Sequence, residues 1–544
     1  MIDPAEMNGE RNHITRDSKT NWSIFVIILV AFFLARGVVI LCILPPLEGW
    51  DEYQHVAYIQ YLIDHETTPI ARAPETSVSA SLMEAVTTLP QPEYMLEQTR
   101  GAGGYGYDAY WEDSRISSLP DDSWSPPPLY QAQHSPPYYQ LVEPIYSWSG
   151  GSSNLKASIA VLRSLNLLFA AGALAFILVS LGRLLSPGDA RIVGLLVSLQ
   201  PLFLLNSVRV ANDSLAILLA SFVVATGLHP RAQRSILISI VLGLAAGAAT
   251  VVKAFGVVLI PFIGISYLVS ALTGDLKVRR AVLSGGLSVA SALLLVVPFF
   301  VGNFETYGTP TPMQEGLINR ENGRGIADLL NTALTINWPR RIGWMWLYGS
   351  TWVGGWSFIL LGSTLRLTIS MILIIMSAGW GWRWVSSKAR RIKTFDVSGT
   401  PLRLMALVAL VSAALGYHMI HSKAAWGFIS TNPWYAAFAF PWALTLAYAG
   451  SLQWPARRLG PSLALLLMAL YLGAEVSGTF FRMLPFYSKA VGSTALERMA
   501  SLRPEILDTS TLYVASFLSL FLLGASIWWA LKSLPSGGSA SASL

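Results

Sequence analysis

Two adjacent carboxylates, Asp51 and Glu52, directly follow the first long apolar run of the sequence and are the residues best suited to chemistry. A carboxylate can accept a proton from a substrate hydroxyl and so act as a general base. His55 lies one helical turn after Asp51, so the two side chains share a face if the segment is a helix. Asp51 and His55 could supply two ligands to a metal ion, but no second pair of ligands is evident in the sequence. We predict no protein metal site and leave a divalent cation open as a cofactor.

The same two carboxylates also fit a purely structural role. Asp is a preferred N-cap residue, and Glu in the first turn complements the helix dipole. Apolar positions in residues 50–64 approximate a helical stripe, which predicts a helix lying along the membrane surface. From the residues alone, capping and catalysis both remain open for Asp51.

Basic side chains beside apolar runs are candidates to bind a phosphate. Arg209 lies in a short turn between two apolar runs, and Lys253 lies within apolar sequence. A charge at the centre of a span costs about 2.5–3.5 kcal/mol on insertion scales, so such charges are functional by default. Arg341 lies at the end of an external segment. The alternatives are snorkelling for Lys253 and an interface anchor for Arg341.

Candidate substrate-binding residues come from two further motifs. In the segment 134–139, two consecutive prolines restrict the backbone and would fix the directions of His134, Tyr138 and Tyr139. Asp213 follows Arg209 by four residues and would support it. We predict that these four residues and His55 line a substrate cavity. The alternative for the segment 134–139 is a rigid packed turn, and the alternative for Asp213 is helix capping.

The composition predicts that these residues are carried by membrane-spanning helices. Of the 544 residues, 53% are hydrophobic and only 12% are charged, against about 25% charged in soluble domains. A span needs about 20 largely apolar residues. We therefore predict an all-α polytopic membrane protein with about twelve transmembrane helices. The two shortest runs, 190–206 and 236–251, could instead fuse with neighbouring runs or be re-entrant segments. The runs are 22–44, 157–182, 190–206, 210–228, 236–251, 255–272, 281–301, 356–380, 403–420, 433–451, 460–478 and 509–532.

The distribution of Lys and Arg predicts how these helices are oriented. With the N-terminus in the cytoplasm and twelve alternating spans, every cytoplasmic connection is basic. The net charge of +6 is then a topology signal, and no nucleic-acid partner is predicted. The basic residues of these connections are Arg183, Arg191, Arg231, Arg234, Lys277, Arg279, Arg280, Arg383, Lys388, Arg390, Arg391, Lys393, Arg457 and Arg458.

The orientation divides the chain into cytoplasmic, membrane and external segments. The external segment 45–156 holds 15 Asp and Glu against four Lys and Arg, and at this length it is a subdomain that carries the candidate active site. Both termini are predicted to be cytoplasmic. The remaining segments are an unstructured tail 1–21, a first transmembrane helix 22–44, transmembrane helices two to seven in 157–301, an external loop 302–355, helices eight to twelve in 356–532, and an unstructured tail 533–544.

Several short motifs, in this order and topology, resemble the GT-C superfamily of membrane glycosyltransferases. Residues 46–55 match a Pro-x-x-x-x-Asp-Glu-x-x-His pattern of an uncharacterised family of membrane proteins in that clan. The residues 134–139, the pair Asn212-Asp213, Lys253 and the Trp- and Gly-rich stretch 349–356 match its later elements. The overall plan is similar to that of protein O-mannosyltransferases and the aminoarabinose transferase acting on lipid A.

The resemblance implies transfer of a sugar from a polyprenyl-phosphate-linked donor on the extracytoplasmic face of the cell membrane, usually with inversion. The acceptor would be a glycan, a lipid or a protein. Asp51 would be the base, with Glu52 the competing candidate, and Arg209, Lys253 and Arg341 would bind the donor phosphate. In a late span the Arg-Tyr pair of such families is replaced by Asn432-Pro433-Trp434-Tyr435. Another cation must therefore take the place of that Arg.

Two other classes remain open from the sequence. Twelve spans with both ends inside is also a transporter or flippase plan, although the two halves of this chain are not alike. A non-catalytic assembly factor would need no role for Asp51. The substitution Asp51→Asn separates these classes, since only the enzyme loses sugar transfer.

Overall fold

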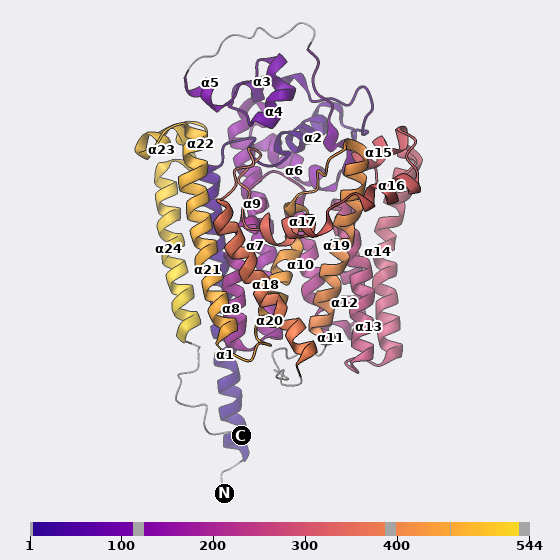
Figure 1. Ribbon diagram of the computed structural model, residues 1–544, viewed down its shortest axis with the longest axis vertical. Coiled ribbons are helices and arrows are strands. Elements are labelled where there is room, and N and C mark those ends of the chain that lie inside the picture. Colours follow the sequence, from indigo (N-terminus) through magenta and orange to yellow (C-terminus); the bar gives the residue numbers. More distant parts are fainter. Residues whose placement is uncertain (1–3, 113–123, 387–398, 457, 533–544) are drawn as a thin grey trace.

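The structure is a computed structural model that describes residues 4–112, 124–386, 399–456 and 458–532, and it is built from helices. Long helices stand side by side in a bundle, and the outer segment 45–156 covers one end of it (Figure 1). The long helices are α1 (Pro4–Ile43), α7 (Leu155–Leu184), α13 (Leu259–Leu272), α14 (Val278–Tyr307), α18 (Ser363–Val385), α19 (Thr400–Trp426), α21 (Leu459–Gly478) and α24 (Thr509–Lys532).

Within the described residues, eight helices are long and apolar enough to cross a membrane, or nine with one bent pair. The bent pair is α8 (Pro187–Ser198) and α9 (Pro201–Ser207), which meet at 53°. The prediction of twelve spans is therefore not supported. The helices α10 (Asp213–Gly227), α12 (Ile236–Val252) and α20 (Phe440–Ser451) occupy three predicted runs but are short. Hydropathy does not distinguish apolar residues that face lipid from those that face protein. Short apolar helices packed inside the bundle were therefore predicted to be transmembrane helices.

Breaks in the short helices place polar residues at their ends. Lys253 follows α12 in an extended conformation, and the 3-10 helix η4 (Ala254–Val258) then leads into α13. The turn between α9 and α10 contains Arg209. Both breaks lie near the end of the bundle that the outer segment covers, so they bring these cations toward the first loop.

Helix α12 is held against α14 by close backbone packing. A Cβ atom on Gly243 would overlap the backbone carbonyl of Ser288, and one on Gly247 would lie 2.8 Å from the carbonyl oxygen of Ala292. Glycines four residues apart allow two helices to approach closely in a membrane. This contact fixes the position of the residue that ends α12, which is Lys253.

The outer segment contains five α-helices within its described residues, and the first of them is buried. Residues 52–62 of α2 are all buried, so the prediction of a helix lying on the membrane surface is wrong. The polar residues of α2 have partners inside the outer segment, such as Tyr130 N–H donating to Gln54 at 3.0 Å. The five helices are α2 (Glu52–His65), α3 (Ala80–Thr87), α4 (Glu93–Thr99), α5 (Tyr107–Trp111) and α6 (Pro137–Trp148).

Glu48 joins the outer segment to other parts of the chain. Its buried carboxyl group accepts hydrogen bonds from Tyr107 Oη at 2.8 Å and Ser357 Oγ at 2.6 Å, and from Tyr487 Oη at 3.2 Å. Burial raises the pKa of Glu48. The first loop is thereby tied to the loop before α18 and to α22 (Leu484–Ser488).

The ends of the chain and the basic connections bear on the predicted topology. The N-terminus lies at the end of the bundle opposite the outer segment, together with α11 (Pro230–Gln233) and the connection from α13 to α14 (Figure 1). Helix α1 begins at Pro4, so residues 4–21 of the predicted unstructured tail are helical in the structure. The tail 533–544 and the predicted cytoplasmic residues Lys388, Arg390, Arg391, Lys393 and Arg457 lie outside the described residues.

Three further elements complete the outer end of the bundle. They are α15 (Gln314–Glu321), α16 (Ile326–Leu334) and α17 (Trp338–Gly343), all in the external loop 302–355. The C-terminal part adds α23 (Gly492–Ser501) between α22 and α24. Helix α15 packs on α19 and brings the loop to the site described next.

Candidate active site

A cavity of about 410 Å³ lies where the outer segment meets the bundle. Six of the ten residues predicted for the site line it: Asp51, His55, His134, Arg209, Asp213 and Lys253. The other four, Glu52, Tyr138, Tyr139 and Arg341, do not belong to its lining. The cavity therefore separates the predicted residues into those that can touch a ligand and those that support the wall.

Asp51 points into the cavity and does not cap α2. Its backbone is left-handed, with φ 59° and ψ 12°, and its side chain makes no capping hydrogen bond. This conformation turns the carboxylate toward Tyr130, whose Oη donates to Oδ1 at 2.8 Å. Of the two interpretations left open by the sequence, the capping role of the Asp51 side chain is wrong.

The electrostatic setting of Asp51 is mixed. Burial raises the pKa of Asp51, while the hydrogen bond from Tyr130 and the charges of Arg209 and Lys253 lower it. The net direction is upward from the ordinary value of 3.8. A carboxylate with a raised pKa is a stronger base, which suits proton abstraction from a hydroxyl group.

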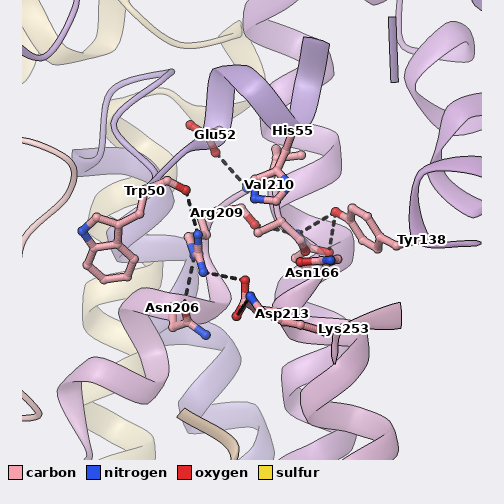
Figure 2. A network of polar contacts seen from close by, with 12 residues as sticks. Trp50, Glu52, His55, Tyr138, Asn166, Asn206, Arg209, Val210, Asp213 and Lys253 are labelled. Carbon is pink, nitrogen blue, oxygen red and sulfur yellow. Dashed lines mark hydrogen bonds and ion pairs between the residues drawn. The ribbon is translucent and has the colours of Figure 1, made fainter. Parts of the chain in front are cut away.

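Glu52 points away from the cavity and is fully paired. Its Oε1 accepts from Arg163 Nε at 2.8 Å and from the backbone N–H of Val210 at 2.8 Å, and its Oε2 accepts from Arg163 Nη2 at 2.6 Å. Figure 2 shows the contact with Val210. The backbone N–H of Gly49 also donates to Oε2, at 3.3 Å. Four donors occupy the lone pairs of the carboxylate, so its geometry argues for a positioning role between α2, α7 and the α9–α10 turn.

Arg163 was missed by the sequence reasoning. It lies in the predicted span 157–182, and a charge inside a span was the signal that could have found it. Besides Glu52, it donates to the carbonyl oxygens of Leu44 and Pro45, each at 2.7 Å. Arg163 thus orients the chain that leads from the first helix to Asp51.

Arg209, Asp213 and Lys253 form a buried ion triplet on the cavity wall. Arg209 Nη2 lies 2.6 Å from Asp213 Oδ2, and Lys253 Nζ lies 2.5 Å from Asp213 Oδ1 (Figure 2). Arg209 also donates to Asn206 Oδ1 at 3.0 Å and to the carbonyl oxygen of Trp50 at 2.7 Å. The triplet carries a net charge of +1 and holds two cations in fixed positions. Lys253 is turned inward, so snorkelling to the interface does not describe it.

His55 and His134, two of the histidines that line the cavity, have lowered pKa values. Burial lowers the pKa of His134 to about 3, and burial together with nearby charges lowers that of His55. The two rings are nearly parallel, with centroids 6.1 Å apart. His55 Nδ1 shares a hydrogen bond of 2.8 Å with Tyr139 Oη. Neutral imidazoles bind a ligand through hydrogen bonds and add no charge to the cation pair.

The two tyrosines of the His134 motif are buried behind the cavity. Tyr138 shares a hydrogen bond with Asn166, whose Nδ2 also donates to the carbonyl oxygen of Arg209 at 2.6 Å (Figure 2). Tyr139 stacks on Tyr58 with centroids 3.8 Å apart. The expectation that both line the cavity is not met, and the packed-turn alternative describes them better.

The cavity lining also includes residues that the sequence did not predict to bind a ligand. Glu315 from α15 and His418 from α19 lie 3.8 Å apart and both line the cavity. Trp434 lies nearly parallel to Trp50, with centroids 4.3 Å apart, and Lys253 Nζ lies 5.7 Å from the ring centre of Tyr435. Trp434 and Tyr435 occupy the stretch that lacks an Arg, so Lys253 supplies a cation there.

A narrow apolar crevice adjoins the ion triplet. It shares Asp213, Lys253, Trp434 and Tyr435 with the cavity and continues along α10, where Ala216, Ile217, Ala220, Gly256, Ala437 and Phe438 also line it. The crevice has a volume of about 20 Å³. The site thus combines a half-buried carboxylate with a cation pair, and such a site can bind an anion beside a base.

No group of three His, Cys, Asp or Glu side chains able to hold a metal ion occurs in the part of the chain that the structure describes. Asp51 and His55 both line the cavity but have no third ligand of this kind.

Comparisons with known proteins find likeness in structure alone. No protein-family model and no curated protein match the sequence. The oligosaccharyltransferase of Archaeoglobus fulgidus in its apo form is similar with a TM-score of 0.41 and 14% identity over 87% of this chain and 56% of that one. The chain thus spans about half the length of that protein.

Two other solved structures are similar to the same degree. The Archaeoglobus fulgidus oligosaccharyltransferase AglB, in complex with an inhibitory peptide and a dolichol-phosphate, gives a TM-score of 0.39 with 13% identity over 87% of this chain and 59% of its own. ArnT from Cupriavidus metallidurans, bound to undecaprenyl phosphate, gives 0.41 with 14% identity, over 93% of this chain and 77% of its own. These matches are likenesses of fold at low sequence identity, and the function is inferred below from the site.

Proposed function

We propose that this protein transfers a sugar from a polyprenyl-phosphate-linked donor to an acceptor hydroxyl, with Asp51 as the base. One observation carries the proposal: a single cavity is lined by Asp51 and by the Arg209–Asp213–Lys253 triplet. A base and a cation pair at one ligand site are the two elements that displacement of a phosphate by a hydroxyl requires.

Each group has a defined task in the proposed reaction. Asp51 takes the proton of the acceptor hydroxyl as its oxygen forms a bond to the anomeric carbon of the sugar. The bond from that carbon to the phosphate oxygen breaks with inversion, and the polyprenyl phosphate leaves as an anion. Arg209 and Lys253 stabilise the charge that develops on the phosphate.

The polyprenyl part of the donor is proposed on the cation pair, which suits a phosphate, and on the apolar setting of the site. The crevice that begins at Lys253 and Asp213, between α10 and η6 (Pro433–Ala439), has a volume of about 20 Å³ and would have to widen to admit an isoprene unit. Arg341 is left out of the proposed phosphate site because it does not line the cavity. The acceptor is a glycan, a lipid or a protein, and the site faces the extracytoplasmic side of the cell membrane.

The substitution Asp51→Asn tests the base. Purified protein in lipid nanodiscs is supplied with lipid-linked sugars and acceptor extracted from membranes of the source cells, and release of polyprenyl phosphate is measured by mass spectrometry. Loss of a general base lowers the rate by about 10²–10⁴-fold. Asp64→Asn is the matched control, since Asp64 is exposed and lies outside the cavity lining. Retained transfer by the Asp51 variant would overturn the base assignment.

The substitution Lys253→Met tests the phosphate site separately. We expect the affinity for undecaprenyl phosphate to fall about ten-fold or more, as for loss of a charged hydrogen bond of 1.5–3 kcal/mol. Lys489→Met is the control, because Lys489 pairs with Asp108 at 2.9 Å outside the cavity. An unchanged affinity of the Lys253 variant for undecaprenyl phosphate would show that the phosphate does not bind at Lys253. Movement of lipid across the membrane without a covalent product would favour a flippase instead.

A further inference from the structure

Helix α16 exposes an apolar stripe on a segment rich in arginine. Ile326, Leu330 and Leu334 are 78%, 62% and 86% exposed and recur at intervals of four residues. Residues at this spacing lie along one side of a helix. None of the residues of α16 is buried, so the stripe is not covered by the described part of the chain.

The other sides of α16 have different surroundings. Leu329 and Ala333 are half-buried, and α16 packs on α19. The polar residues Asp328 and Asn331 are exposed. At 3.6 residues per turn, Asp328 lies opposite the stripe and Asn331 lies about 100° from its centre. One side of α16 therefore meets protein, one is apolar and exposed, and one is polar and exposed, which is the pattern of a helix at a membrane–water interface.

Contacts with α19 place α16 at the end of a candidate span. Lys423 Nζ donates to the carbonyl oxygen of Thr335, directly after α16, at 2.8 Å. Lys423 lies in the last turn of α19, which ends at Trp426. Figure 1 likewise shows α16 beside the outer ends of α14 and α19. The helix thus lies at the level where a spanning helix leaves the apolar layer.

The segment that follows α16 runs back along α19. Trp346 Nε1 donates to Ser412 Oγ at 3.1 Å. The helical rise from Lys423 to Ser412 is about 16 Å at 1.5 Å per residue. Helix α17, which carries Arg340 and Arg341, lies between these two contacts in the chain and begins within three residues of the Lys423 contact. Its arginines are therefore near the interface.

The charges of this segment are predominantly positive. Arg340 and Arg341 form no ion pair among the described residues, and Arg340 is exposed. Of the nearby acids, Glu321 pairs with Arg72 at 2.8 Å, and Asp328 accepts from the backbone N–H of Gly325 at 2.8 Å. The surplus of cations beside an apolar stripe is complementary to a layer of anionic phospholipid.

We propose that α16 and α17 form a membrane-interface element, in which the Ile326–Leu330–Leu334 stripe inserts into the lipid leaflet on the cavity side and Arg340 and Arg341 bind phosphates of anionic phospholipids. Through α15, this element connects the bilayer with Glu315 on the cavity wall.

The stripe is tested by site-specific fluorescence in nanodiscs. Cys42 is the chain's one cysteine and is buried, so a Cys42→Ser background allows a single label at Leu330→Cys or, as the matched control on the same helix, at Asn331→Cys. We expect a spin-labelled lipid to quench the Leu330 label at least three-fold more than the Asn331 label. Insertion of the stripe would be overturned if a water-soluble quencher reached both labels equally. It would also be overturned if neither quencher reached the Leu330 label, which would indicate that a protein partner covers the stripe.

The arginines are tested by lipid retention. Native mass spectrometry compares phosphatidylglycerol bound to the wild-type protein and to Arg340→Gln/Arg341→Gln. We expect the preference for phosphatidylglycerol over phosphatidylcholine to fall about five-fold per arginine, as expected for about 1 kcal/mol per charge near an anionic surface. Arg100→Gln, an exposed position of the outer segment, should leave the preference unchanged. An unchanged preference in the double variant would overturn the lipid assignment, and loss of bound inorganic phosphate alone would indicate a soluble anion.

Discussion

The left-handed backbone at Asp51 decides what this carboxylate can do. A non-glycine residue with φ near 59° is uncommon, although Asp tolerates it better than most residues. In an ordinary N-cap conformation the carboxylate would bond the free N–H groups of α2. Here the side chain is directed to Tyr130 and the cavity, so the strain is retained at a position where it exposes a base.

The hydrogen bond from Tyr130 yields a prediction on pH dependence. The proposed reaction requires ionised Asp51, so its rate should fall as the pH drops through the pKa of Asp51, which burial raises. Tyr130 lowers that pKa, and Tyr130→Phe should therefore move the acid limb of kcat/KM to higher pH. The pH–rate profile is the measurement, with Tyr146→Phe as control because Tyr146 bonds Gln60 away from the cavity. An acid limb that stays fixed or moves to lower pH would contradict the role of Tyr130.

The pair Glu52–Arg163 yields a prediction on stability. Both side chains are buried, so Glu52→Gln leaves Arg163 without its counter-charge. We expect a loss of about 3–5 kcal/mol in the free energy of unfolding, since breaking a buried ion pair from one side is costly. Glu52→Met/Arg163→Met should recover part of it. Thermal unfolding in detergent is the measurement, and a Glu52 variant that loses transfer while keeping full stability would instead support Glu52 as a base.

Residue types identified about half of the site. Asp51, Arg209, Asp213 and Lys253 stood out because charges beside or within apolar sequence need a reason. Glu315 and His418 did not, since an isolated Glu in a loop and an isolated His in a helix are ordinary until a fold brings them together. Glu52 looked equivalent to Asp51 because its partner, Arg163, is 111 residues away.

At the scale of the elements, the close contact of α12 with α14 governs the position of Lys253. Gly243→Ala places a methyl group against the carbonyl of Ser288. Overpacking of this kind typically costs about 1–3 kcal/mol. We expect a lower unfolding temperature together with weaker binding of undecaprenyl phosphate, measured on the same preparation.

Gly286→Ala is the matched control for that experiment. Gly286 lies on α14, and a Cβ atom there would meet no atom within 4 Å. Equal effects of the two substitutions would show that the α12–α14 contact does not carry the effect on binding.

The helices themselves were largely predictable, and their lengths were not. Every apolar run coincides with a helix, because burial of apolar side chains and satisfaction of the backbone both favour helices in a membrane. Run lengths failed at α10 and α20, where the structure has 15 and 12 residues. A turn such as that at Lys253 is invisible to hydropathy when its flanking residues are apolar.

At the scale of the molecule, the outer segment and the N-terminus lie at opposite ends of the bundle. The positive-inside rule then predicts that Glu75 faces the outside and Arg234 the cytoplasm. In a Cys42→Ser background, a membrane-impermeant maleimide added to intact cells should label Glu75→Cys. Arg234→Cys should be labelled only after the membrane is permeabilised. Both positions are exposed, so the reverse pattern would invert the orientation and place the cavity in the cytoplasm.

The shared carboxylate of Asp213 has a consequence for turnover. With Asp213 between them, Arg209 and Lys253 carry a net charge of +1. This charge balances the single negative charge of the phosphodiester in the proposed donor. The released phosphomonoester carries about −1.5 to −2 at pH 7 and should be held more tightly than the donor. Departure of the spent carrier then limits the steady rate, so rapid mixing with excess donor should give a burst of about one sugar per protein, followed by a slower phase. Progress curves without a burst would show that the bond-breaking step, or one before it, is slowest.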